Sequence, residues 1–518
     1  MAVSDWTIRR LLPGVFLLLC SCPLRAAEKS YSYLAALESI SADELKLHVD
    51  YLADDKLEGR EAGRSGGLAA GGYLEDRLAE LDLRAAGTDG SFFQRFPPNF
   101  RNVLARIEGS DPQLKDQFII VSAHYDHVGY GTRRNSRGPI GYIHNGADDN
   151  ASGTAGLLEL AEAFTMLDEP PKRTVLFAFW DAEEKGLLGS KYWVAHPTIS
   201  LDHVVAEINM DMIGRLRNDR LVLFGTRSGY GWRRLASLQN DGPALRLDFS
   251  WTLKPNSDHY PFFQHDIPVL LLHTGFNDAY HTPRDDARHI NNRGMRRVSQ
   301  FLFAVVYELA DREQPPRFRK LARRETESTR KRLAACINKP AARLGVRWDP
   351  NEPAIGGLRL AHVVSGSAAE RAGLTAGDRI VDFAGRKIRS GEDLRAAVTR
   401  AENPAATVVK RADLDQPLQM TVELAGKPIR LGISWRIDDA EPGTIILTHV
   451  VPGSPAAKAG LRPGDRVYQI GGEDFSDDRL FAHLAQTLPE PLELLVERDG
   501  RLRTVVIYVE TEPARRAA

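Results

Sequence analysis

From about residue 118 onward, segments of continuous apolar residues alternate with segments in which apolar residues have helical spacing. This pattern predicts alternating strands and helices. Continuous apolar runs such as FIIVSAHYD and RTVLFAFWDAEE are typical of strands that are buried on both faces. The runs HVVAEINMDMIG, RLVLFGT and IPVLLLHTG predict three further strands. Between them, GTAGLLELAEAFTML and KGLLGSKYWVAH have helical spacing, and MRRVSQFLFAVVYELAD predicts a long closing helix. Strands that alternate with helices indicate a mixed, mostly parallel sheet that helices cover on both faces.

The preceding residues, 31 to 100, begin with helical patterning. YSYLAALESISADELKLHVDYLA precedes a glycine-rich break, and LAAGGYLEDRLAELDL predicts another amphipathic helix. We therefore predict one α/β domain over residues 31–313.

Residues 314–340 are charged and bounded by prolines. Their basic cluster could form a binding patch, but the composition favours a solvated linker helix. The cluster consists of Arg317, Arg319, Lys320, Arg323 and Arg324.

An internal repeat follows this segment. VVSGSAAERAGLTAGDRIVDFAG returns 87 residues later as VVPGSPAAKAGLRPGDRVYQIGG, and the same offset places Trp348 on Trp435. A shared offset over distant segments indicates two copies of one domain. We place the copies at residues 341–425 and 427–511.

The composition adds limits to this picture. The chain has 518 residues, too many for one ordinary core, and its 43% of apolar residues is typical of a globular protein. The formal net charge of -1 gives no reason to expect nucleic acid or an anionic membrane as a partner.

The first residues have the pattern of a secretory signal. RRLLPGVFLLLC combines two arginines with an apolar run too short to span a membrane, and LRAA supplies small residues for cleavage, so residues 1–27 are predicted to be a signal peptide. The protein is therefore expected in the periplasm or outside the cell, either free or anchored by a lipid on Cys22. Of the three cysteines, Cys20 and Cys22 lie in or beside this signal, so Cys336 alone cannot build a disulfide framework.

Acids and histidines gather at the predicted carboxyl ends of four strands and in one glycine-rich loop. The carboxyl ends of the strands are where open α/β sheets bind ligands. Carboxylates and imidazoles without cysteine suit zinc or a similar divalent ion, and their number suits two ions bridged by one carboxylate. The residues are His124, Asp126, Asp148, Asp149, Glu183, Glu184, Asp211 and His281.

Two spacings suggest roles within this set. Residues two apart on a strand face the same side, so Asp126 can accept a hydrogen bond from the ring of His124. The neighbours Glu183 and Glu184 cannot both point at one spot, so one can bind metal while the other stays free as a base. Each pattern alone is common in structural positions, and their joint occurrence at strand ends carries the prediction.

The motifs HYDHVG, NGADDNASG, DAEEKGLLGS, NMDMIG, SDHYPF and HTPRDD together resemble those of the M28 metallopeptidases, the two-zinc aminopeptidases of the aminopeptidase Y and leucyl aminopeptidase type. The resemblance covers about residues 45 to 310 and implies an αβα phosphorylase/hydrolase-like fold. It implies that Asp148 bridges two zinc ions and that the peptide bond between Asp148 and Asp149 is cis. It also implies His124 and Asp211 on one zinc, Glu184 and His281 on the other, Glu183 as general base and Asp126 as partner of His124.

This resemblance predicts an exported aminopeptidase that removes N-terminal residues from peptides. Met212 and Tyr280, each beside a ligand, are candidates for the wall of the side-chain pocket or for the core. Asp149, Asp181 and Asp258 are expected to make structural hydrogen bonds. Carboxypeptidase action, glutaminyl cyclisation and an inert peptide-binding scaffold are the alternatives that the sequence leaves open.

Both repeats resemble PDZ domains of the kind appended to bacterial secreted proteases. The segments LGV and LGI then look like loops that catch a peptide C-terminus through backbone amides, and a packing or regulatory role is the alternative. The loop residues are Leu344, Gly345, Val346, Leu431, Gly432 and Ile433.

Overall fold

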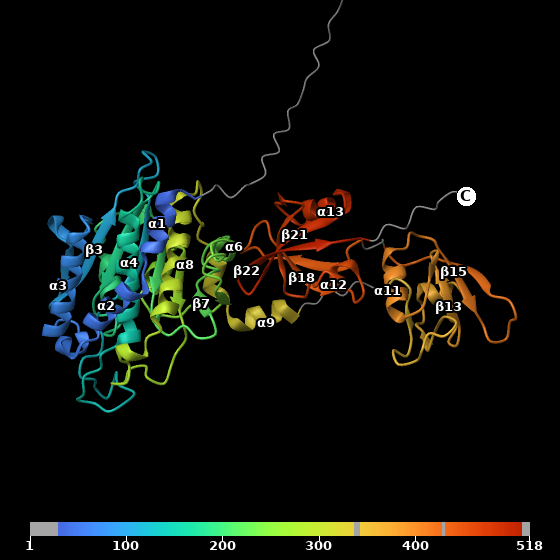
Figure 1. Cartoon of the computed structure of the whole chain (residues 1–518), viewed down its shortest axis with the longest axis horizontal. Coiled ribbons are helices and arrows are strands. Elements are labelled where there is room, and N and C mark those ends of the chain that lie inside the picture. Colours follow the sequence, from blue (N-terminus) through green and yellow to red (C-terminus); the bar gives the residue numbers. More distant parts are fainter. Residues whose placement is uncertain (1–28, 336–341, 427–429, 510–518) are drawn as a thin grey trace, which may run out of the picture.

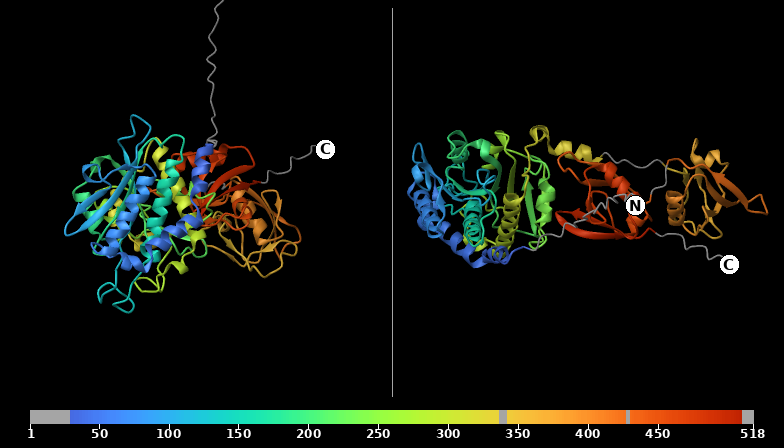
Figure 2. Two further views of the ribbon diagram at one scale, coloured as in Figure 1. Left: turned by 60° about the vertical axis from the view of Figure 1, so that its left-hand side comes forward. Right: turned by 90° about the horizontal axis from the view of Figure 1, so that it is seen from above.

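The structure is a computed structural model that describes residues 29–335, 342–426 and 430–509. It places three bodies in a row (Figure 1). The second repeat domain (residues 430–509) lies between the α/β domain and the first repeat domain (residues 342–426), and Figure 2 shows the same order from above. The chain therefore passes the second repeat domain, forms the first and then returns. The predicted signal peptide and Cys336 lie outside the described residues.

The α/β domain is built on one nine-stranded sheet with the order β1-β3-β5-β4-β6-β9-β7-β8, and β2 pairs with β3. The central strands β5, β4, β6 and β9 are parallel, whereas β3 and β7 run antiparallel to their central neighbours. The mixed, mostly parallel sheet is thus confirmed. The strands are β1 (Arg84–Ala85), β2 (Phe93–Phe96), β3 (Phe100–Ile107), β4 (Phe118–His124), β5 (Thr174–Trp180), β6 (Val204–Met210), β7 (Arg220–Phe224), β8 (Arg246–Ser250) and β9 (Val269–His273).

Helices cover both faces of this sheet. One face packs against four helices that share a large apolar core, and the other packs against two short helices over a second core. The first group is α1 (Tyr31–Ser39), α2 (Ala42–Leu52), α4 (Gly153–Thr165) and α8 (Asn292–Asp311), and the second is α5 (Leu188–Ala195) and α7 (His259–Gln264). α3 (Ser65–Glu80) lies beside β3, and α6 (Trp232–Leu238) lies at the far edge, toward the second repeat domain. Within the described residues, no helix is long and apolar enough to cross a membrane.

The two repeat domains have matching elements at the offset that the sequence predicts. Helix α10 (Ala368–Arg371) corresponds to α12 (Pro455–Lys458), and α11 (Gly391–Arg400) corresponds to α13 (Asp478–Thr487). Each domain has its own apolar core. The strands are β10 (Val346–Arg347), β11 (Leu358–Arg359), β12 (His362–Val363), β13 (Arg379–Phe383), β14 (Arg386–Lys387), β15 (Ala405–Lys410) and β16 (Leu418–Val422), then β17 (Ile433–Ile437), β18 (Ile445–Val450), β19 (Arg466–Ile470), β20 (Glu473–Asp474), β21 (Leu492–Arg498) and β22 (Arg501–Ile507).

A glycine is required at the same place in both repeats. Gly345 and Gly432 have φ angles of 81° and 78°, a region that side chains disfavour. A Cβ at these positions would come within 2.3 Å of Ser367 and 2.2 Å of Ser454, which cap the following short helices. The LGV and LGI segments are therefore tight turns against a helix start.

The segment after the α/β domain is packed, and the prediction of a solvated linker is wrong for its first part. Arg319 is only 1% exposed and forms ion pairs with Glu325 and with Asp439 of the second repeat domain. Arg323 pairs with Asp266. Helix α9 (Glu327–Ala335) follows and runs below the second repeat domain (Figure 1). The packing of this segment depends on Asp439 and Asp266, which lie 120 and 57 positions away from their arginines in sequence.

The second repeat domain docks on the α/β domain through buried charges. Arg227 pairs with Asp438 at 2.6 Å, and Arg233 forms a two-pronged contact with Glu497 at 2.9 and 3.0 Å. Burial alone would raise the pKa of Glu497, but Arg233 and Arg466 outweigh it and lower this pKa to about 2. The stabilisation is therefore present above the ordinary carboxyl pKa and is lost as the pH falls toward 2.

Replacing Glu497 is expected to weaken this docking. Glu497→Gln leaves Arg233 and Arg466 without their buried counter-charge, which costs about 3 kcal/mol. Calorimetry should then resolve unfolding of the second repeat domain at a lower temperature. Glu493→Gln, an exposed change on the same strand, is the control. An unchanged transition in Glu497→Gln would contradict the docking role of this pair.

Candidate metal centre

Two groups of potential metal ligands meet at one carboxylate, that of Asp149. The Nε2 atom of His124 lies 3.4 Å from Oδ1 of Asp149 and 3.6 Å from Oδ1 of Asp211. On the other side, Nε2 of His281 lies 3.0 Å from Oδ2 of Asp149 and 3.1 Å from Oε1 of Glu184. The two oxygens of Asp149 thus face two separate groups, as a bridging carboxylate requires.

The elements that bring these residues together are the parallel strands. His124 ends β4, while Glu184, Asp211 and His281 lie in the loops that follow β5, β6 and β9. Because these strands run in the same direction, their carboxyl ends meet at one edge of the sheet. Asp149 reaches the same edge from the π-helical turn Ala147–Ser152 before α4.

Asp148 does not take the bridging position that the resemblance implied. Its Oδ1 accepts a hydrogen bond from the amide of Gly214 at 2.9 Å, and its Oδ2 accepts one from Asn277 at 3.0 Å. Burial and the carboxylate of Asp285 raise the pKa of Asp148 well above its usual range. For Asp149, His124 and His281 outweigh burial and lower the pKa well below it. Asp148 therefore belongs to the framework of the loop, and Asp149, expected to be structural, faces both ligand groups.

The cis peptide bond is likewise one residue further along than predicted. It joins Asp149 to Asn150, not Asp148 to Asp149. The side chain of Asn150 donates to the carbonyl of Met210 and accepts from the amides of Gly153 and Met212. These contacts tie the loop to the end of β6 and the start of α4.

His127 is a functional candidate that the sequence analysis missed. It is 1% exposed, its Nδ1 lies 2.9 Å from Oε1 of Glu184, and it joins Asp149, Glu184 and His281 in one group whose ligand atoms lie within 4.8 Å of one another. The motif HYDHVG contains it three residues after His124. In the sequence, only its being a histidine near His124 indicates a metal ligand. The second group therefore offers four ligand atoms, and the first group offers three from His124, Asp149 and Asp211.

Asp126 organises the turn that carries Glu183 and Glu184. Its two carboxylate oxygens accept hydrogen bonds from the amides of these residues at 3.0 and 3.4 Å. Its backbone carbonyl lies 3.2 Å from Nδ1 of His124, whereas the nearer carboxylate oxygen is 3.7 Å away. The expected contact between His124 and Asp126 thus runs mainly through the backbone. Burial raises the pKa of Glu183 well above its usual range, while His124 opposes this rise.

A buried hydrogen-bond chain supports Asp211 from behind. Ser257 donates to Oδ2 of Asp211 at 2.7 Å, and Asn209 donates to Ser257 at 2.7 Å. Asp258, expected to be structural, accepts from Ser190, and Asp181 accepts from the amides of Arg101 and Ala182. These hydrogen bonds fix the positions of the side chains at the edge of the sheet. Most of them join residues that are distant in sequence, so the sequence alone does not predict them.

Two buried charges hold the loop that contains Asp149. Oδ2 of Asp285 accepts from the amides of both Asp148 and Asp149 at 3.0 Å. Arg60 is fully buried and donates to the carbonyls of Leu52, Tyr125, Asn145 and Gly146. Because these groups are out of reach of water, losing either side chain would leave them unsatisfied.

The remaining candidates take different positions. Met212 is 1% exposed and belongs to the core, whereas the ring of Tyr280 packs 3.9 Å from the ring of His281 and borders a cavity of about 500 Å³. Tyr280 is therefore the better candidate for a pocket wall. In the first repeat domain, Leu344, Gly345 and Val346 line a cavity of about 180 Å³ together with helix α11. In the second, Leu431 and Ile433 are buried in the core beside Gly432.

This sheet, with its clustered acids and histidines, defines a metallopeptidase-like α/β domain. Residues 102–306 match Peptidase family M28, and residues 360–410 and 446–498 match PDZ domains. Residues 102–306 therefore form a domain of peptidase family M28, and two PDZ domains follow it, as the resemblance predicted.

Several characterised proteins are similar to this chain. Aminopeptidase YwaD of Bacillus subtilis is 29% identical over 38% of this chain and 42% of its own length. Leupeptin-inactivating enzyme 1 of Streptomyces exfoliatus is 26% identical over 48% of this chain and 57% of its own length. The chain thus spans about half the length of these curated relatives. Among solved structures, the LapA aminopeptidase of Legionella pneumophila is 23% identical, with a TM-score of 0.46 over 54% of this chain and 75% of its own.

Proposed function

We propose that this protein is an exported two-zinc aminopeptidase that removes N-terminal residues from peptides. The observation that carries the proposal is the position of Asp149, whose two oxygens face two separate groups of ligands. His124 and Asp211 would hold one zinc ion, and His127, Glu184 and His281 would hold the other. Asp149 replaces Asp148 as the bridging residue.

The residues fit such ions by their chemistry and by their unmet hydrogen bonds. Within the described residues, both ring nitrogens of His127, Oε1 of Glu184 and Nε2 of His281 are buried without a hydrogen-bond partner. Nδ1 of His127 and Nε2 of His281 lie 2.9 and 3.1 Å from Oε1 of Glu184 without forming hydrogen bonds, as ligand atoms around a common ion would. Imidazole and carboxylate donors suit zinc, and burying them without hydrogen bonds or an ion would be costly. When bound, two zinc ions would polarise the peptide carbonyl and lower the pKa of water.

Glu183 is proposed as the general base. Its neighbour Glu184 belongs to a ligand group, whereas Glu183 belongs to neither. Its carboxylate would take a proton from the attacking water and return it to the leaving amine. Asp126 is a positioning residue, since it holds the amides of both glutamates.

The flanking parts of the chain complete the proposal. Residues 1–27 would direct export to the periplasm or the exterior, with a lipid on Cys22 as the alternative to a free protein. The groove of the first PDZ domain, between the LGV turn and helix α11, would hold peptide C-termini. The second PDZ domain is docked on the catalytic domain and would act mainly in packing.

A substrate panel tests the activity. Mature protein with zinc is expected to cleave aminoacyl-p-nitroanilides and not their N-acetylated forms, and chelation should abolish the cleavage. Peptides blocked only at the C-terminus should remain substrates. Cleavage that requires a free C-terminus would instead indicate a carboxypeptidase, and cyclisation of N-terminal glutamine would indicate a glutaminyl cyclase. Peptide binding without any turnover would indicate a scaffold.

His127 is expected to tighten the second metal site. His127→Ala removes one of four ligand atoms, so zinc affinity at that site should fall by about 10–100-fold or more. Titration against a chelating dye measures this affinity, and activity should return in excess zinc. His289→Ala, an exposed change, is the control. Unchanged affinity in His127→Ala would remove this residue from the ligand set.

A further inference from the structure

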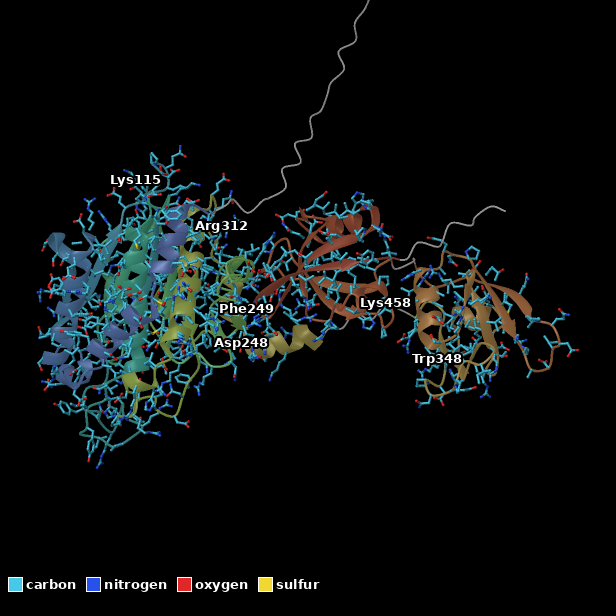
Figure 3. The ribbon with its side chains drawn as sticks, in the orientation of Figure 1. Lys115, Asp248, Phe249, Arg312, Trp348 and Lys458 are labelled. Atoms are coloured by element: carbon cyan, nitrogen blue, oxygen red, sulfur yellow. The ribbon has the colours of Figure 1, made fainter. Side chains whose placement is uncertain are left out.

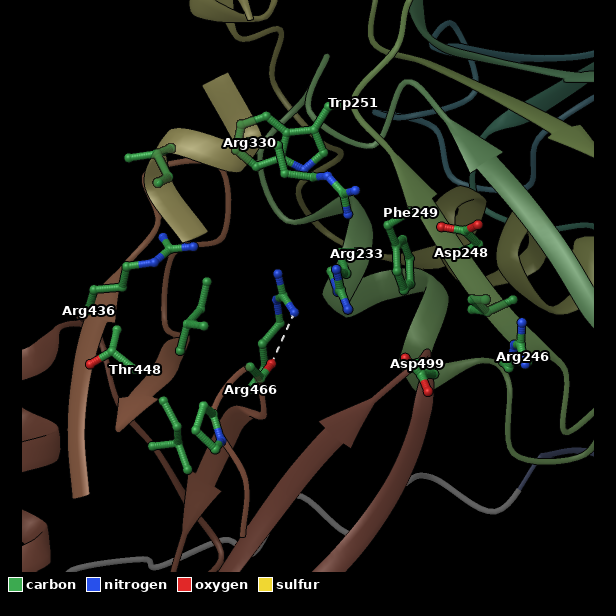
Figure 4. A pocket seen from close by; sticks show the side chains of 16 residues that line it. Arg233, Arg246, Asp248, Phe249, Trp251, Arg330, Arg436, Thr448, Arg466 and Asp499 are labelled. Atoms are coloured by element: carbon green, nitrogen blue, oxygen red, sulfur yellow. Dashed lines mark hydrogen bonds between the residues drawn. The ribbon is translucent and has the colours of Figure 1, made fainter. Parts of the chain in front are cut away.

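A cavity of about 680 Å³ lies where the second PDZ domain meets the catalytic domain (Figure 4). Its walls come from β8 of the catalytic domain, from helix α9, and from β17, β18 and β19 of the PDZ domain. Phe249 and Trp251 give it an aromatic side. It is distinct from the metal centre and from the PDZ groove beside α11.

The cavity is basic. Five arginines line it against two aspartates, and Figure 4 shows guanidinium groups from both domains facing the opening. Arg233 and Arg330 are paired with the nearby acids Glu497 and Glu327. The aspartate Asp248 is paired with Arg220. The other three arginines still outnumber the other aspartate. The five arginines are Arg233, Arg246, Arg330, Arg436 and Arg466.

The charge of Arg466 is only partly compensated. Its side chain is largely buried, and among the described residues its Nε has no hydrogen-bond partner. One of its terminal nitrogens donates to the carbonyl of Gly464 at 3.4 Å, and Glu497, which Arg233 already engages, is 3.9 Å away. Burial, followed by the charge of Arg233, lowers the pKa of Arg466 to about 10. A buried guanidinium in this state favours an anionic ligand, because a carboxylate would supply the missing charge and acceptors.

The cavity continues toward the metal centre. A second cavity of about 370 Å³ shares Asp248, Phe249 and Arg330 with it and extends to Asn256 and Phe276. The ring of Phe276 lies 5.0 Å from that of Tyr280, which packs on His281. Asn256 immediately precedes Ser257, the hydrogen-bond donor to Asp211. The two cavities therefore adjoin at the residues that they share, on the side of the catalytic domain that faces the second PDZ domain (Figure 3). Together they are called the groove, whose one end lies near residues that contact the metal centre and whose other end holds the arginine cluster.

We propose that this groove binds the downstream part of peptide substrates and that the arginine cluster selects peptides with carboxylates at that end. The inference rests on the proposed function, because an aminopeptidase holds the N-terminus of its substrate at the metal centre. The remainder of the peptide then lies along this groove, and its acidic side chains or its terminal carboxylate contact the arginines. The preferred substrates are thus acidic peptides long enough to span the groove.

Paired peptides of increasing length test this selectivity. Each pair shares an N-terminal leucine and differs only at its end, which is either acidic with a free carboxylate or neutral with glutamine and an amide. Above a threshold length, the acidic peptide should have a kcat/KM about tenfold higher, and salt should reduce the difference. In Arg246→Gln/Arg330→Gln the difference should vanish, while cleavage of leucine p-nitroanilide stays unchanged. Both arginines are exposed, so this variant should fold.

Arg84→Gln, at the opposite edge of the sheet, is the matched control and should retain the preference. No preference in the wild type, or one that survives in the double variant, would overturn the inference. Absence of leucine p-nitroanilide cleavage would defeat the proposed function alone. Calorimetric binding of the same peptides would then decide: binding of acidic peptides that is lost in the double variant supports the groove, and equal binding of both kinds overturns it.

Discussion

Asp149→Asn is expected to reduce peptidase activity to the level of the chelated protein, whereas Asp148→Asn should keep activity within about tenfold of the wild type. The two aspartates are neighbours of the same type and are both buried. Asp149 alone faces both ligand groups, and an amide there would offer one metal-binding oxygen in place of two. At Asp148, an asparagine keeps an acceptor for the amide of Gly214, and Asn277 can turn its amide to present oxygen.

Zinc content and activity of both variants measure this difference. Asp149→Asn should bind less than the two zinc ions proposed for the wild type, and Asp148→Asn should bind both. Circular dichroism and thermal unfolding confirm that each variant is folded. Loss of zinc in Asp148→Asn with retention in Asp149→Asn would restore the assignment that the resemblance implied.

The error of one residue at this loop has a physical origin. GADDN presents two aspartates, and their directions depend on the backbone path of the π-helical turn, which begins after Gly146 in a left-handed conformation. Asp285 fixes that path by accepting from the amides of both residues, yet it lies 136 and 137 positions away in sequence. A motif therefore locates the metal loop, but only the tertiary contacts decide which carboxylate points inward.

The other elements were predictable to the degree that their signals are local. Apolar runs predict β4, β5, β6, β7 and β9, because strands that are buried on both faces appear as continuous apolar segments. The shared offset predicts both repeats, because a duplicated domain appears as a repeated sequence. Strand β8 and helices α6 and α7 were not assigned, since they are short and partly polar. The burial of Arg319 and the role of His127 depend on partners from other elements, which spacing along the chain does not reveal.

Glu183→Gln is expected to lower kcat by about 10²–10⁴-fold while zinc content and KM stay close to those of the wild type. Glutamine has nearly the same shape as glutamate. The backbone N–H of residue 183 would still donate to Asp126, so the turn should keep its position. A side-chain amide cannot accept a proton from water at neutral pH, so the loss should fall on the chemical step.

The adjacent change Glu184→Gln provides the contrast. Glu184 lies 3.1 Å from His281 and 2.9 Å from His127 in the second ligand group, so this variant should lose zinc together with activity, and excess zinc should restore part of both. Metal analysis beside steady-state kinetics distinguishes the two variants. If Glu183→Gln lost zinc, or retained full activity with zinc bound, proton transfer would have to be assigned to another group. Asp258 would then be the first candidate, because burial raises its pKa to about 7 and one of its oxygens has no hydrogen-bond partner within the described residues.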